Sequence, residues 1–267
     1  MEDLVPREQA FDLYGRTWRR VADQLEGLRI HPDAAVPHLD WTIGDLALHL
    51  VQATEVAGRL LEGESSPYTD MHRIGEVNEQ FLAMRSDRDL SSLAVEFREH
   101  AQRIESRFRE MPDDFPVPFH GGMTFTPARA MAMMSCELLV HGWDIAQVTG
   151  QAYEVVPHDA RLILHTVLPI MTKMVIPETV KGFVATYEVR IRGGATFRLH
   201  FEDEALQVSH VEPGGPADCR ISAEPSAFLL MGYGRGSQIT PVLTGKMVAW
   251  GRKPWLAMKF TRLVKSP

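Results

Sequence analysis

The sequence predicts an α+β protein in which an N-terminal helical bundle is followed by a smaller C-terminal α/β domain. Over the first 150 of its 267 residues, apolar side chains recur at the three- and four-residue spacing of amphipathic helices. After residue 150 the pattern changes, because residues 183–192 are rich in β-branched and aromatic residues and precede a Gly-Gly pair, as in a β-hairpin. A chain of this length is sufficient for two domains. We therefore expect a bundle over residues 1–153 and an α/β domain over residues 154–267.

Two helices of the first domain have clear boundaries in the sequence. Thr42 and Asp45 have the spacing of a capping box, at the start of a helix that Gly63 ends. Thr126-Pro127 is a typical helix start and Gly150 a typical helix end. Helices are expected at residues 7–28, 42–63, 71–84, 91–108 and 126–150, and four or five long helices of this kind fit a bundle.

The remaining segments are a long loop in the first domain and a β-meander with helices in the second. The Pro-rich stretch at residues 112–118 predicts a loop, which continues through His120-Gly121-Gly122. In the second domain, strands are expected at residues 183–192, 195–201, 204–211, 218–222 and 247–250, and helices at 157–174, at 225–233 and from 254 onward.

Composition and charge exclude several classes of protein. Lys plus Arg number 28 and Asp plus Glu 35, so the net charge of −7 lacks the basic character of a nucleic-acid binder. No apolar run is long enough for a membrane helix, and the first residues do not resemble a signal peptide. With only Cys136 and Cys219, a disulfide framework is excluded and a reducing compartment is expected. These features predict a cytoplasmic protein that binds neither nucleic acid nor membrane.

One pair of residues stands out as a candidate metal site. Glu137 and His141 are four residues apart, so their side chains lie on one face of a helix, one turn apart. A carboxylate and an imidazole so placed can share a divalent ion, and tetrahedral zinc needs a third ligand, for which His49 is the candidate. Asp45 lies four residues before His49 and Asp144 three after His141, so either carboxylate could orient a ligand.

The residues alone leave a purely structural interpretation open. A Glu and a His four residues apart are common by chance, and a histidine at the edge of an apolar helix stripe is often just packed and hydrogen-bonded. Cys136 points about 100° away from Glu137 and is expected to be a buried small residue. There is no G-x-S-x-G, Walker or dinucleotide-binding motif. Histidines expected on solvated faces or in loops are His31, His38, His72, His100 and His158.

Two segments resemble the signatures of the mycothiol-dependent maleylpyruvate isomerase family. They are Trp41-Thr-Ile-Gly-Asp-Leu-Ala-Leu-His49-Leu50 and Glu137-Leu-Leu-Val-His141-Gly-Trp-Asp-Ile-Ala146, the latter followed by Thr149-Gly150-Gln151. The resemblance implies a DinB-like four-helix bundle in which the final His of the first motif and the Glu and His of the second bind a divalent metal, usually zinc. Carried over, these ligands are His49, Glu137 and His141.

The C-terminal part is similar to the sterol carrier protein-like α/β domain that follows the bundle in this family. The segment Phe228–Arg235 resembles the family's helix that ends in Gly-Arg. Where relatives commonly have Gly-Asp near the end, this chain has Gly251-Arg252-Lys253, a difference in the part expected to shape the substrate pocket.

The resemblance implies an enzyme that uses a metal and mycothiol. A thiol bound to the metal is deprotonated and becomes a nucleophile. We expect the thiolate to add to a small-molecule electrophile and to catalyse cis-trans isomerisation. Since guanidinium groups bind carboxylates through paired hydrogen bonds, Arg235 is the candidate catalytic residue for a dicarboxylate, with His120 also near the metal. A mycothiol S-transferase and a non-catalytic binding module for an apolar ligand remain alternatives, and the protein is expected to be a monomer or homodimer.

Overall fold

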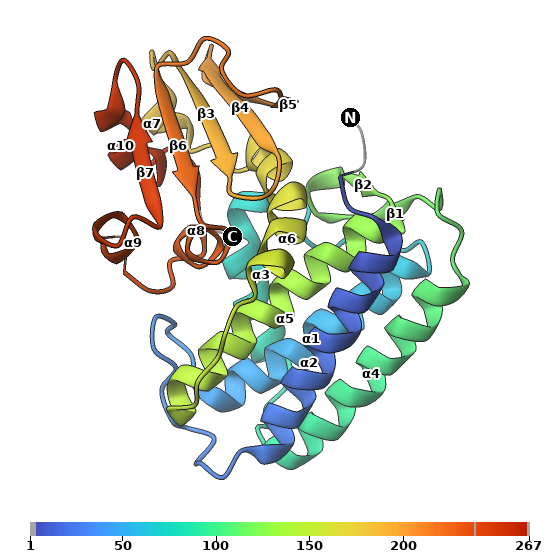
Figure 1. The fold of residues 1–267 in the computed structure, drawn as a ribbon. Helices are drawn as coiled ribbons and strands as arrows, with labels where there is room; N and C mark the ends of the chain where they lie inside the picture. Colours follow the sequence, from blue (N-terminus) through green and yellow to red (C-terminus); the bar gives the residue numbers. More distant parts are fainter. Residues whose placement is uncertain (1–3, 238, 266–267) are drawn as a thin grey trace. The chain divides into compact units, whose positions relative to one another are not determined.

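The computed structural model describes residues 4–237 and 239–265, which form two compact units. One unit spans Val5–Val155 and the other contains Leu4 and the described residues from Val156 onward. The fold class is α+β, as predicted: the first unit is mainly helical and the second contains a five-stranded sheet with helices (Figure 1).

Four long helices form a bundle in the first unit. Each contacts two others, since α1 packs against α4 and α5, and α2 also packs against α4 and α5. The short helix α3 follows a 3₁₀ turn, η1, and packs on α2. The helices are α1 (Arg7–Gly27), α2 (Ile43–Leu61), η1 (Met71–Arg73), α3 (Ile74–Ala83), α4 (Leu90–Glu110) and α5 (Pro127–Thr149).

The caps that the sequence predicts fix the ends of α2 and α5. The Thr42 hydroxyl accepts a hydrogen bond from the backbone N–H of Asp45, and the Asp45 carboxylate accepts one from the N–H of Thr42, which completes the capping box. Thr126 caps α5, and Gly150 ends it with a φ of 66°, a left-handed conformation that glycine adopts without strain. These caps set the residues at which α2 and α5 begin. They therefore help to set the position of each side chain along the bundle axis.

The loop expected between α4 and α5 contains a small β-hairpin instead. Strands β1 (Val117–Pro118) and β2 (Thr124–Phe125) pair antiparallel, and the 3₁₀ turn η2 (His120–Gly122) forms the tip. Strands of two residues are too short to produce a recognisable alternation in the sequence, which explains why a loop was predicted.

The second unit is built on a sheet with the strand order β5-β4-β3-β6-β7. The meander β3-β4-β5 is antiparallel, β3 and β6 are parallel, and β6 and β7 are antiparallel. The strands are β3 (Ala185–Ile191), β4 (Thr196–Glu202), β5 (Ala205–Val211), β6 (Cys219–Ala223) and β7 (Met247–Trp250), close to the predicted ranges.

Helices pack on this sheet and complete its core. The helix α6 contacts β5 and α8, while α10 contacts β6. Tyr187, Phe197 and Phe201 are fully buried between these elements. The helices are α6 (Pro157–Ile170), η3 (Met171–Lys173), α7 (Pro177–Val180), α8 (Pro225–Gly232), α9 (Thr240–Leu243), η4 (Pro254–Leu256) and α10 (Ala257–Phe260).

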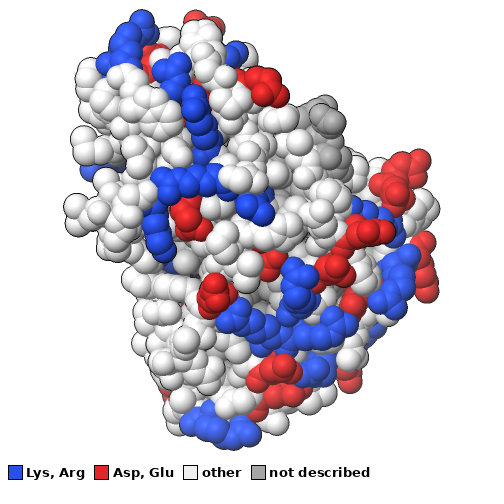
Figure 2. All heavy atoms as spheres, viewed as in Figure 1, with Lys and Arg blue, Asp and Glu red and all other residues white. Residues whose placement is uncertain are grey.

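Charged side chains of both signs alternate on the surface of the helical unit. On the face of the helical unit that Figure 2 shows, basic and acidic side chains lie next to one another. Several of them pair between helices, as Arg19 does with Glu105 and Arg98 with Asp23. Among the described helices, none has both the length and the apolar composition needed to cross a bilayer.

Candidate metal centre

Three side chains from two helices of the bundle meet at one point. His49 comes from α2, and Glu137 and His141 come from successive turns of one face of α5. Their potential ligand atoms all lie within 4.8 Å of one another. The structure therefore brings together the three residues proposed as metal ligands, although His49 and Glu137 are 88 residues apart in the sequence.

A single carboxylate oxygen joins the two imidazoles. Oε1 of Glu137 lies 2.7 Å from Nε2 of His49 and 3.2 Å from Nε2 of His141. The two histidine side chains are 5% and 9% exposed, whereas that of Glu137 is 33% exposed. The two imidazoles are therefore buried in the bundle, whereas the carboxylate of Glu137 is partly accessible to solvent.

The charges of the cluster shift the pKa values of its members. Burial alone would raise the pKa of Glu137, but His141 and His49 outweigh it and hold the pKa well below its ordinary value. Burial works to lower the pKa of His141, yet the carboxylates of Glu137 and Asp144 raise it to about 9. For His49, burial dominates and lowers the pKa. The carboxylate is therefore ionised and ready to bind a cation.

A second carboxylate orients one of the imidazoles. Asp144 is fully buried and lies with Oδ2 2.9 Å from Nδ1 of His141, which directs Nε2 of that ring toward Glu137. Carboxylates that hold the far nitrogen of a metal-ligating histidine are common in metal sites. The indole of Trp41 packs against both rings, with centroid distances of 4.8 Å to His49 and 6.3 Å to His141.

Asp45, the other carboxylate considered for this role, does not orient His49. Its Oδ2 completes the capping box at Thr42, and its Oδ1 accepts a hydrogen bond from Nε of Arg88 at 2.7 Å. A carboxylate in the first turn of a helix accepts hydrogen bonds from the free N–H groups there. The side chain of Asp45 is therefore engaged at the start of α2 and not at His49.

Sequence reasoning missed the surroundings of His120 at the tip of the hairpin. Ser66, in the segment after α2, lies with Oγ 2.7 Å from Nδ1 of His120, and the ring of Tyr68 is 4.4 Å from the imidazole. The charge of Glu137 acts on both His120 and Tyr68 and shifts their pKa values upward, against burial in His120 and together with burial in Tyr68. Ser66 stands in a short polar segment with no pattern that could have revealed the contact.

Comparison with known families agrees with this geometry. Residues 14–146 match the mycothiol maleylpyruvate isomerase N-terminal domain, and residues 172–265 match the SCP-2 sterol transfer family. By its helical domain, the chain belongs to the mycothiol maleylpyruvate isomerase family. This confirms the resemblance expected from the two motifs, and both domains occur in the expected order.

Solved structures support the same fold over most of this isomerase-family chain. The crystal structure of the mycothiol-dependent maleylpyruvate isomerase aligns with a TM-score of 0.56 at 18% identity, covering 89% of this chain and 94% of that one. A variant of that enzyme with one histidine replaced by alanine aligns with a TM-score of 0.58 at 18% identity, covering 89% and 93%. The comparison with curated proteins returned no match.

In this member of the family, the C-terminal residues singled out by the sequence have clear local roles. Arg235 follows the end of α8, is buried and donates a hydrogen bond to the carbonyl of Tyr233 at 2.6 Å. Its catalytic role stays a prediction. Arg252 and Lys253 both pair with Asp218, at the start of β6. The departure from Gly-Asp at residues 251–252 therefore supplies the cation for a buried carboxylate.

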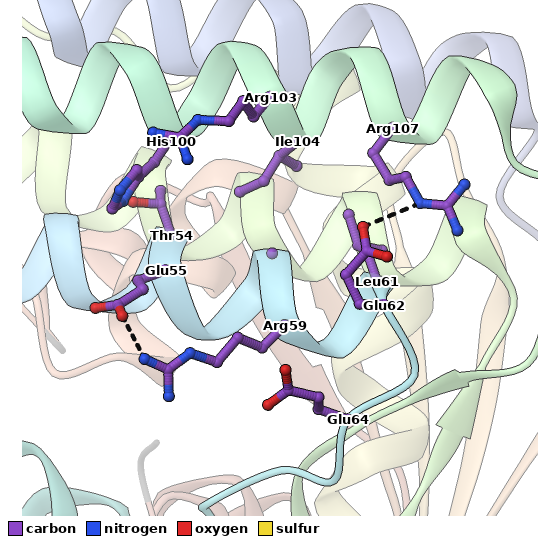
Figure 3. A pocket seen from close by; sticks show the side chains of 11 residues that line it. Thr54, Glu55, Arg59, Leu61, Glu62, Glu64, His100, Arg103, Ile104 and Arg107 are labelled. Atoms are coloured by element: carbon purple, nitrogen blue, oxygen red, sulfur yellow. Dashed lines mark hydrogen bonds and ion pairs between the residues drawn. The ribbon is translucent and has the colours of Figure 1, made fainter.

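A groove lies between α2 and α4 (Figure 3), and its lining includes none of the three proposed metal ligands. Its volume is about 280 Å³, and its charged side chains pair with one another: Arg59 with Glu55, and Nε of Arg107 with Oε1 of Glu62 at 3.4 Å. His100, expected on a solvated face or in a loop, is half-buried and lines this groove.

Cys136 is buried, as predicted.

Proposed function

We propose that this chain is a divalent-metal- and mycothiol-dependent enzyme of the maleylpyruvate isomerase type. The observation that carries the proposal is the convergence of His49, Glu137 and His141, whose donor atoms lie within 4.8 Å of one another in a domain of this family. Ligand sets of two histidines and one carboxylate are typical of catalytic zinc, because three protein ligands leave a position for a substrate atom.

The residues present fit such an ion. Glu137 is an ionised, partly exposed carboxylate between two buried imidazoles, and Asp144 holds the far nitrogen of His141, as expected for a metal ligand. Zinc is the proposed metal, held by Nε2 of His49, the Glu137 carboxylate and Nε2 of His141. When bound, the ion would lower the pKa of a coordinated thiol and make it a thiolate at neutral pH.

The chain's own residues then provide the setting for the reaction. Trp41 packs over the two histidines and fixes their rings, while burial of the cluster in the bundle excludes water from its inner side. In the proposed isomerisation, the thiolate sulfur of mycothiol adds to one carbon of a cis double bond, the former double bond rotates as a single bond, and the sulfur leaves to give the trans product. Arg235 is the proposed partner for a substrate carboxylate.

A binding function for an apolar ligand is the second candidate, because the C-terminal unit has a cavity of its own. The cavity measures about 160 Å³ and lies between α6, α8 and the segment that follows α10. Its lining is mostly apolar and includes Leu164, Leu168, Met171, Phe228 and Phe260. In this alternative the helical unit would serve as a scaffold and no thiol-dependent turnover would occur.

Metal content and thiol-dependent turnover test the proposal together. Protein purified without chelator is analysed for metal and assayed with mycothiol and maleylpyruvate, beside the variants Glu137→Ala and Glu55→Ala. We expect one zinc-like ion per chain and thiol-dependent turnover in the natural protein, and loss of both in Glu137→Ala. Glu55 is an exposed residue of α2 that pairs with Arg59, so its substitution should change neither.

The same assay separates the alternatives. A thioether that accumulates with a panel of electrophiles, without isomerisation, would identify an S-transferase. Stoichiometric metal with no thiol-dependent consumption of any electrophile would contradict the enzyme proposal and favour the binding function.

A further inference from the structure

The tip of the β1-β2 hairpin holds His120 in a fixed position. The backbone N–H of Phe119 donates to the carbonyl of Met123 at 2.7 Å, which closes the turn. Gly121 has a φ of 64°, and its N–H donates to the carbonyl of Tyr68 at 2.8 Å, which ties the tip to the segment after α2. A turn held on both sides in this way allows His120 little freedom of movement.

The imidazole of His120 is also held by its neighbours. It stacks on Phe119 with the ring centroids 4.3 Å apart, and the ring of Tyr68 is 4.4 Å away on another side. Nδ1 lies 2.7 Å from Oγ of Ser66, and that oxygen already accepts a hydrogen bond from the backbone N–H of Tyr68 at 3.1 Å. The Ser66 hydroxyl can donate its proton to Nδ1, and this arrangement would place the proton of a neutral imidazole on Nε2.

Nε2 of His120 is the group that remains for a ligand. Within the described part of the chain it has no hydrogen-bond partner, whereas Nδ1 is engaged by Ser66. Burial lowers the pKa of His120 to about 4, although the nearby charge of Glu137 opposes this, so the ring is neutral near pH 7. A neutral, oriented imidazole with an unused N–H is a hydrogen-bond donor to a developing negative charge.

The hairpin that carries His120 contacts both helices of the proposed metal centre, α2 through β1 and α5 through β2. The charge of Glu137 also acts on Tyr68, whose pKa is raised by burial and by that carboxylate. The hairpin leads directly through Phe125 into α5, which carries two of the three proposed ligands, and β1 packs against α2, which carries the third.

We propose that His120 contacts the substrate and donates its Nε2–H to the oxygen that becomes negative when the thiolate adds, with Ser66 fixing the tautomer. This inference rests on the proposed function. In the addition, the sulfur–carbon bond forms and the π electrons of the conjugated double bond move to a carbonyl oxygen, giving an enolate. When the sulfur leaves, that electron pair re-forms the double bond, and the Nε2 proton stays on His120 throughout.

Two substitutions at residue 120 separate hydrogen bonding from packing. His120→Phe removes the donor but keeps an aromatic ring, whereas His120→Gln keeps an N–H near the same position. Loss of one such donor costs about 10²- to 10³-fold in kcat. We therefore expect His120→Phe to lose this much, with metal content and the KM for mycothiol unchanged, and His120→Gln to lose about tenfold or less. Equal kcat values for His120→Phe and the natural protein would overturn the inference.

A measurement that does not need turnover tests the same claim. In NMR spectra of ¹⁵N-histidine-labelled protein, the signal of His120, assigned by its loss in His120→Gln, should show the Nε2–H tautomer. Maleylpyruvate added without thiol should shift this signal, and Ser66→Ala should give a mixture of tautomers. An Nδ1–H tautomer, or no shift with substrate, would overturn the role of His120 even in an active enzyme. Absent turnover in the natural protein would instead contradict the proposed function, and the NMR result would still decide on His120.

Discussion

Asp144 holds Nδ1 of His141 at 2.9 Å from a fully buried position, so the imidazole can turn only Nε2 toward Glu137. The contact lies within one turn of α5, because residues three apart share a helix face. In many metal sites a carboxylate in this position fixes the tautomer of the ligating imidazole and strengthens its bond to the metal.

Replacing Asp144 by Asn should therefore weaken metal binding without removing a ligand. The amide keeps the size of the side chain but no longer provides a charged acceptor, and loss of such a partner typically costs 10- to 100-fold in metal affinity. Competition with a chromophoric chelator measures the affinity. Asp45→Asn is the matched control, because Asp45 pairs with Thr42 and Arg88 and should leave metal affinity unchanged. An unchanged affinity in Asp144→Asn would show that the contact is only structural.

Metal should stabilise the helical unit through its three proposed ligands. An ion present at about 100 times its dissociation constant contributes about 2.7 kcal/mol, which corresponds to a rise in Tm of roughly 5–10 °C for a unit of this size. Circular dichroism in the helical region, with and without zinc, measures the shift. In His49→Ala the zinc-dependent shift should disappear while the helical spectrum remains, and a shift equal to that of the natural protein would exclude His49 as a ligand.

The capping box should contribute measurably to stability, independently of metal. Thr42→Ala removes the hydroxyl that accepts the N–H of Asp45 and should cost about 1 kcal/mol, or roughly 2–4 °C in Tm. Thr42→Ser keeps the hydroxyl and should retain most of that stability. Thermal unfolding of the metal-free protein provides the comparison, and equal losses in both variants would assign the effect to the methyl group.

The ion pairs of Asp218 should make the C-terminal unit sensitive to acid. Hydrogen bonding from Arg252 is the main cause that lowers the pKa of Asp218 to about 2, with Thr186 and Lys253 also contributing. Because the pKa is lower in the folded state, this stabilisation is complete above the ordinary pKa of aspartate and is lost as the pH falls toward 2. The difference in Tm between the natural protein and Asp218→Asn should therefore be larger at pH 6 than at pH 2.5, and a difference independent of pH would contradict this account.

The boundaries of the main elements follow from local signals, but the contacts between distant segments do not. Thr42, Thr126 and Gly150 mark the helix ends because capping depends on a few neighbouring residues. The pairing of His49 with Glu137 depends on how α2 and α5 pack, so the residues alone could only suggest His49 as the third ligand. The family resemblance implied the same set. The environment of His120 depends on a two-residue hairpin and on Ser66, neither of which has a sequence pattern.

Thiol titration of the cobalt-loaded protein tests the central claim most directly. Cobalt replaces zinc in such sites and absorbs visibly, and thiolate ligation changes its spectrum and releases a proton. We expect mycothiol to change the spectrum of the natural protein in a saturable manner, with about one proton released per site, and to have no such effect on Glu137→Ala. A cobalt spectrum that does not respond to mycothiol would contradict thiol activation and would make the metal structural.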